Sequence, residues 1–189
     1  MNSKITFTMI FVLSLGAMAI SGCLLPRPEP PRLHDCSPES LLVDISVFPD
    51  DFVGGNPMRP LPDEGSNSIG VDMANEMIHI SHDVLPFRTP KGAEKRFAEE
   101  VHGVERNYPE LRSVDISSLG LHADQAILRC GEKGARVRCI YQARYDNFYI
   151  EFILRSPNIE DPTEVVFPAL QNIDQKMLKC FADHPAPEE

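Results

Sequence analysis

Apolar and polar positions alternate between Leu121 and Leu154, and this pattern predicts three β-strands. The pairs Lys133-Gly134 and Asp146-Asn147 are typical turn residues and separate the strands. If Asp146-Asn147 is a two-residue turn, side chains that meet across the second hairpin share one face, because orientation along a strand repeats every two residues. The pairs on that face are Tyr145 with Phe148, Ala143 with Ile150, Tyr141 with Phe152, and Cys139 with Leu154.

The first hairpin agrees with the second. A turn over residues 133–136 places Cys130 opposite Cys139 and Leu128 opposite Tyr141, so both hairpins present the same apolar face. We therefore predict a three-stranded antiparallel meander near 121–155. A further strand is expected from Met77 to Val84.

Two segments have the apolar spacing of amphipathic helices. The first follows the cap and first-turn pair Thr89-Pro90 and covers 90–106, and the second covers 165–182. Since Pro168 cannot lie deep inside a helix without losing a hydrogen bond, the second helix begins near Phe167 or is kinked there. The apolar positions are Ala93, Phe97, Val101 and Val104 in the first, and Val166, Leu170, Ile173, Met177 and Cys180 in the second.

The terminal helix is expected to cover the apolar face of the meander. The fold class is therefore α+β, a single antiparallel sheet packed by two helices. The order of helix, hairpins and terminal helix resembles that of the PsbP-like family, a likeness of pattern that implies no activity.

Composition limits the function classes. The chain has 189 residues, 42% hydrophobic and 24% charged, which is ordinary for a globular protein, and residues 36–182 have the size of one domain. The net charge of −10 argues against nucleic acid as a partner, because phosphate contacts need concentrated Lys and Arg.

The first 22 residues have the pattern of a secretion signal. Lys4 precedes an apolar run from Ile5 to Ile20, which is short for a membrane-spanning helix. The run ends in Ile20-Ser21-Gly22-Cys23, and this motif resembles the lipobox of bacterial lipoproteins. The resemblance implies cleavage after Gly22, a diacylglyceryl group on Cys23, and acylation of the new amine. Two or three chains anchor a protein stably to a membrane.

This resemblance places the protein in the cell envelope, lipid-anchored and facing the periplasm or the exterior. With Leu24 after the lipidated cysteine, it implies the outer membrane if the source is Gram-negative. Residues 23–35 contain four prolines, which predicts a semi-rigid tether. Residues 183–189 are expected to form a flexible tail.

Four cysteines remain beside Cys23, and an even number in an exported chain predicts two disulfides, with three pairings possible. The register of the hairpin favours Cys130–Cys139, which leaves Cys36–Cys180. A four-cysteine zinc site is the alternative, but it normally needs closely spaced cysteine pairs, which are absent from the sequence.

Two groups of polar residues are candidates for chemistry. His79 and His82 are metal-ligand types, but on a strand they point to opposite faces, so we expect no metal site and two partly exposed side chains. On the polar face of the meander, Arg138 would lie opposite Arg155, with Arg129 diagonal to Arg138. Facing like charges need a partner, either a carboxylate from a loop or a bound anion.

The sequence has no GxSxG, HExxH, P-loop or GxGxxG motif, and we expect no enzyme activity and no cofactor. The main prediction is a non-enzymatic envelope lipoprotein that acts as an accessory, scaffold or interaction module for envelope proteins. The alternative is a binding protein for a small anion, lipid or apolar ligand, marked by an open cavity at Tyr141, Phe152, Leu170 and Met177. A hydrolase with an unrecognised site is the third class.

Overall fold

The computed structural model describes residues 34–54, 68–134, 136–157 and 159–186. The predicted signal peptide, Cys23 and residues 24–33 of the tether lie outside these residues. By the contacts that residues make with one another, Pro31–Glu189 is one compact unit. None of the helices in the described ranges is long and apolar enough to cross a membrane.

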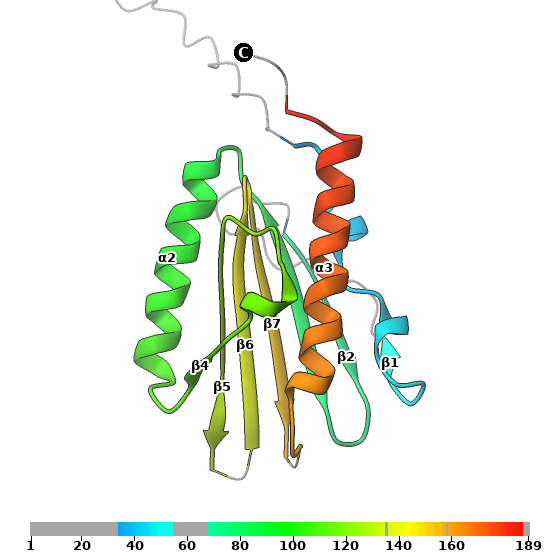
Figure 1. Ribbon diagram of the computed structural model, residues 1–189, viewed down its shortest axis with the longest axis vertical. Coiled ribbons are helices and arrows are strands. Elements are labelled where there is room, and N and C mark those ends of the chain that lie inside the picture. Colours follow the sequence, from blue (N-terminus) through cyan, green and yellow to red (C-terminus); the bar gives the residue numbers. More distant parts are fainter. Residues whose placement is uncertain (1–33, 55–67, 135, 158, 187–189) are drawn as a thin grey trace, which may run out of the picture. The chain divides into compact units, whose positions relative to one another are not determined.

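In the described part of the chain, seven strands form one antiparallel sheet in the order β1-β2-β3-β7-β6-β5-β4 (Figure 1). The predicted α+β class is confirmed. The strands are β1 (Val53–Gly54), β2 (Ile69–Ala74), β3 (His79–Pro86), β4 (Arg112–Val114), β5 (Gln125–Lys133), β6 (Arg136–Tyr145) and β7 (Phe148–Ser156). The helices are α2 (Pro90–Asn107) and α3 (Thr163–Asp183), with short 3₁₀ turns at Pro38–Leu41, Ile45–Val47 and Ser117–Leu119.

Strands β5, β6 and β7 form the predicted meander with the predicted register. Tyr145 pairs with Phe148, and Cys130 pairs with Cys139. The turn residue Asp146 has a φ of 49°, a left-handed conformation that Asp tolerates better than most residues. Its backbone N–H donates to Asp124 Oδ2 at 2.6 Å, and the buried Asn147 side chain donates to the Phe87 carbonyl at 3.0 Å. These contacts fix the turn and hence the register.

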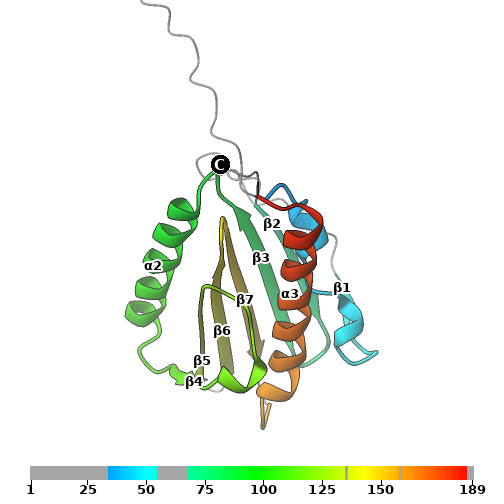
Figure 2. The ribbon, with the colours of Figure 1, turned by 45° about the horizontal axis from the view of Figure 1, so that its top comes forward.

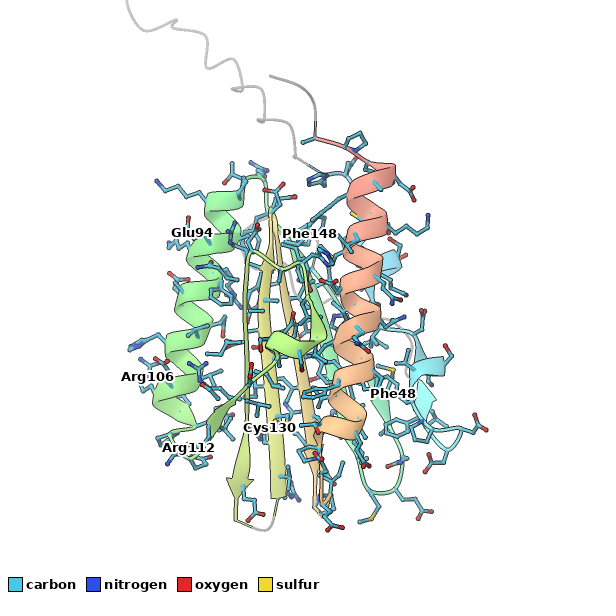
Figure 3. The ribbon with its side chains drawn as sticks, in the orientation of Figure 1. Phe48, Glu94, Arg106, Arg112, Cys130 and Phe148 are labelled. Atoms are coloured by element: carbon cyan, nitrogen blue, oxygen red, sulfur yellow. A yellow bond between two sulfur atoms is a disulfide. The ribbon has the colours of Figure 1, made fainter. Side chains whose placement is uncertain are left out.

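The two faces of the sheet are covered by different helices (Figures 1 and 2). Helix α3 packs over the aromatic face, where Phe148 is fully buried between sheet and helix (Figure 3). Helix α2 covers the opposite face, where Val104 packs with Ile140 and Ile153. Thr89 caps α2 by accepting from the backbone N–H of Gly92, as its sequence predicts. Helix α3 begins at Thr163, earlier than expected, so that Pro168 lies inside it.

The segment before the sheet is part of the core. Leu41 is buried, and Lys176 of α3 donates to the Leu42 carbonyl at 2.6 Å and to Asp44 at 2.8 Å. The structure contains the disulfide Cys36–Cys180, which joins this segment to the last helix, and the disulfide Cys130–Cys139 within the first hairpin.

The two disulfides should contribute unequally to stability. The loop-entropy model assigns about 5 kcal/mol to a closure of 144 residues, as between Cys36 and Cys180, and about 3 kcal/mol to the closure of 9 residues at Cys130–Cys139. Urea unfolding of the two double serine variants should therefore show the larger loss for Cys36→Ser/Cys180→Ser. Equal losses would contradict this explanation.

Candidate anion-binding site

A basic pocket lies on the α2 side of the sheet, at the end where the β2–β3 hairpin turns and α3 begins. It encloses about 230 Å³ and is lined by Arg136, Val137, Arg138 and Arg155. Helix α2 stops at Asn107, and Figure 1 shows the sheet strands β5 and β6 continuing beyond that end of the helix. The pocket therefore forms where the sheet is longer than the helix that covers it.

The register of β6 and β7 places two of these arginines directly opposite each other. Arg138 pairs with Arg155, as the sequence predicts. The Cα atoms of Cys130 and Cys139 are 4.1 Å apart, the spacing of a non-hydrogen-bonded pair. A residue that forms a non-hydrogen-bonded pair with one neighbouring strand forms a hydrogen-bonded pair with the other, so Cys139 and Leu154 are hydrogen-bonded. Because the two kinds of pair alternate along a regular antiparallel ladder, the next pair, Arg138 and Arg155, is a close, non-hydrogen-bonded one. Two like charges thus meet at the closest cross-strand position.

Each guanidinium of this pair has a contact that orients it without neutralising it. The Cζ atom of Arg138 lies 4.4 Å from the ring centroid of Tyr108, just after the end of α2. Arg155 donates to Nδ1 of His79 at 3.2 Å. Because Nδ1 accepts this bond, the proton of the neutral imidazole is on Nε2, which lies 3.8 Å from Asp72. His79 therefore positions Arg155 at the edge of the pocket.

The pocket keeps an excess of positive charge. Within the described ranges, no ion pair to Asp or Glu engages Arg136, Arg138 or Arg155. The charge of Arg155 also acts on Asp83 of β3, whose pKa is raised overall because burial and the nearby Asp72 outweigh the lowering effect of Arg155. Three guanidiniums of an acidic protein are thus left available to an anion, and their planar donors suit bidentate oxygen contacts.

Arg129 lies diagonal to Arg138 as predicted, because it pairs with Ile140, but it has a carboxylate partner and does not line the pocket. Its side chain is 9% exposed and donates to Glu105 of α2 at 2.6 Å. The carboxylate partner that the sequence left open thus exists for Arg129, although it comes from a helix and not from a loop. The third arginine of the pocket is Arg136, which the sequence analysis did not single out. His79, considered there only as a metal-ligand type, instead accepts a hydrogen bond from Arg155.

The histidines of β3 separate as their spacing predicts. His79 faces the arginine pocket, whereas His82 faces the core. The expectation that both are partly exposed is wrong for His82, which is fully buried and accepts from the backbone N–H of Val43 at 2.9 Å. No group of three or more His, Cys, Asp or Glu side chains with the geometry of a metal site occurs among the described residues.

Two other polar clusters make their hydrogen bonds within the protein. Asp174 of α3 accepts from Tyr145 at 3.0 Å and from the backbone and ring of His122 at 2.7 and 2.9 Å, which pins the strand-connecting segment to the helix. Beneath α2, burial and the nearby Glu100 raise the pKa of Glu151 to about 6, and the Tyr149 hydroxyl donates to it at 3.1 Å. Asp174 is buried, Glu151 is half-buried, and both are hydrogen-bonded, so they hold neighbouring elements together.

The aromatic face is a filled core. Tyr141, Phe152, Leu170 and Met177 have no exposed surface, so they do not line an open cavity between the sheet and α3. This arrangement does not support an apolar ligand at that place.

Comparison with known proteins finds similar folds but does not identify a ligand. No protein-family model matches the chain, and no curated protein matches it in sequence. The extracellular domain of PknH from Mycobacterium tuberculosis is similar in structure, with a TM-score of 0.53 and 10% identity over 75% of this chain and 94% of that one. A GTP binding regulator from Thermotoga maritima has a TM-score of 0.37 and 9% identity, over 79% and 90% of the two chains. A protein from Bacteroides thetaiotaomicron has a TM-score of 0.36 and 12% identity, over 66% and 42%.

Acid should destabilise the protein through His82. Burial lowers the pKa of His82 from 6.5 to about 3, so the unfolded chain binds the extra proton between these values. Above pH 6.5, neutral His82 makes its full contribution to the free energy of unfolding. This contribution decreases by up to about 1.4 kcal/mol per pH unit as the pH falls toward 3.

The variant His82→Gln isolates this effect, because Glu151, whose raised pKa acts in the opposite direction, is present in both proteins. In urea unfolding from pH 7 to pH 4, the stability difference between wild type and variant should narrow as the pH falls. A difference that stays constant with pH would contradict the assignment.

Proposed function

We propose that the protein is a non-enzymatic, lipid-anchored domain of the cell envelope that binds an anion in the arginine pocket. The observation that carries the binding role is the set of three guanidiniums, Arg136, Arg138 and Arg155, around one pocket without a carboxylate ion-pair partner among the described residues. Because like charges at the Arg138–Arg155 cross-strand position destabilise a sheet, an anion between them would stabilise the folded protein as well as bind.

An extracytoplasmic location is supported by three observations. Two disulfides are typical of oxidising compartments. The fold also occurs in a domain described as extracellular. The motif Ile20-Ser21-Gly22-Cys23, which resembles a lipobox, precedes proline-rich residues that lead to the described domain from residue 34. On this proposal, lipid on Cys23 holds the domain at a membrane surface.

The chemistry of the pocket favours binding over catalysis. Its lining of three arginines and one valine contains no nucleophile, and a guanidinium stays protonated at any physiological pH. Such a pocket can hold and orient an anion, but its lining has no group that exchanges protons at neutral pH. The main rival is a scaffold that uses other surfaces and binds no small anion.

Replacing both facing arginines should remove anion binding. The fragment Pro31–Glu189 contains the whole compact unit and can be titrated calorimetrically with inorganic phosphate. We expect the variant Arg138→Gln/Arg155→Gln to lose about 100-fold in affinity, since two charge-assisted contacts are removed. The control Lys91→Gln/Lys95→Gln has the same change in net charge at the start of α2 and should bind like wild type. Equal affinity of the arginine variant and the control would favour the scaffold.

The lipid anchor has a separate test in the full-length chain. Expression in a bacterium with a metabolically incorporated palmitate analogue should label the wild type, and Cys23→Ala should abolish the label and release the protein from membranes. Unchanged labelling of Cys23→Ala would refute lipidation at this cysteine without affecting the anion site.

A further inference from the structure

A second hollow adjoins the arginine pocket and shares two of its arginines. It encloses about 400 Å³ and is bordered by Arg136, Arg155 and His79 on one side. The remainder of its lining comes from the β2–β3 hairpin, residues 74–78, and from Ser156 and Pro157 at the end of β7. The two hollows are therefore neighbours on either side of Arg136 and Arg155, so these two arginines can contact a ligand in either hollow.

The second hollow differs in character from the first. Ala74, Met77, Ile78 and Pro157 make much of its lining apolar. Met77 is 46% exposed, one of few large hydrophobic side chains so exposed in the described ranges. Its flexible thioether can adapt to an apolar ligand without a preformed shape.

The hairpin that carries Met77 is held in place. Asn75 accepts from the backbone N–H groups of Met77 and Ile78 at 2.9 and 2.6 Å, and its side chain donates to Asp51 at 3.0 Å. The exposure of Met77 is thus the result of an ordered turn. The apolar wall has a defined position beside the charged pocket.

We infer that the ligand is a phosphate ester with an attached hydrocarbon group, its phosphate at Arg136, Arg138 and Arg155 and its hydrocarbon against Met77, Ile78 and Pro157. This inference rests on the proposed anion-binding function and specifies the ligand class. Glu76, which also lines the second hollow, disfavours another anionic group there and favours a ligand with one charged end. A phospholipid headgroup region and a free alkyl phosphate share this chemistry.

A series of alkyl phosphates tests the inference with the Pro31–Glu189 fragment. Inorganic phosphate, ethyl phosphate and hexyl phosphate present the same charged group with increasing apolar surface. Because burial of each methylene is favourable, hexyl phosphate should bind at least about tenfold more tightly than inorganic phosphate. The variant Met77→Ser should retain phosphate affinity and lose most of this gain, whereas Leu178→Ser, which alters an exposed apolar side chain on α3, should retain both.

The outcomes separate the two proposals. If phosphate binds and hexyl phosphate binds no more tightly, or if Met77→Ser keeps the full gain, the ligand class is refuted and the anion site stands. If neither compound binds, the proposed function fails too. Vesicles of phosphatidylglycerol and of phosphatidylcholine distinguish the sources. Binding to the former alone supports a lipid headgroup, and binding to soluble alkyl phosphates without vesicle binding supports a free ester.

Discussion

The two-residue turn at Asp146-Asn147 sets the register on which the rest of the structure depends. It places Tyr145 opposite Phe148 and, by the period of two, directs Tyr141, Tyr145, Phe148 and Phe152 to one face and Arg138 and Arg155 to the other. A shift of one residue would bury the arginines and expose the aromatic residues. The left-handed Asp146 and the buried Asn147, with their bonds to Asp124 and Phe87, hold this register. The core and the pocket are therefore two results of one constraint.

The two faces of the sheet differ because α3 and α2 cover different lengths of the strands beneath them. Helix α3 spans the aromatic face, is tied to the N-terminal segment by Cys36–Cys180, and leaves Tyr141 and Phe152 fully buried. Helix α2 ends at Asn107, and the strands continue past it to Arg136 and Ser156. Tyr108, the residue after this end, lies against Arg138. A filled core on one face and an arginine pocket on the other are thus set by where each helix stops.

Local pattern predicted the parts of this arrangement that depend on short sequence distances. Turn residues and alternation gave the meander, both hairpin registers and the pairing of Arg138 with Arg155. The pairing of His79 with Arg155 depends on the joining of β3 to β7, 76 residues away, which no local pattern specifies. The position of Arg129 followed from the register, but its partner did not, because the packing of α2 on the sheet brings Glu105 to it. The burial of His82 had a signal that was missed, since Ile80, His82 and Val84 alternate as core positions.

On our proposal, an anion binds between the guanidiniums of Arg136, Arg138 and Arg155. The most direct measurement is a phosphate titration followed by the Nε–Hε signals of the arginine side chains in ¹H–¹⁵N NMR spectra. We expect saturable shifts for these three side chains with one shared affinity, while the signal of Arg129, which is already bonded to Glu105, stays unchanged. Shifts that grow linearly with phosphate and are equal for all arginines, Arg129 included, would contradict it.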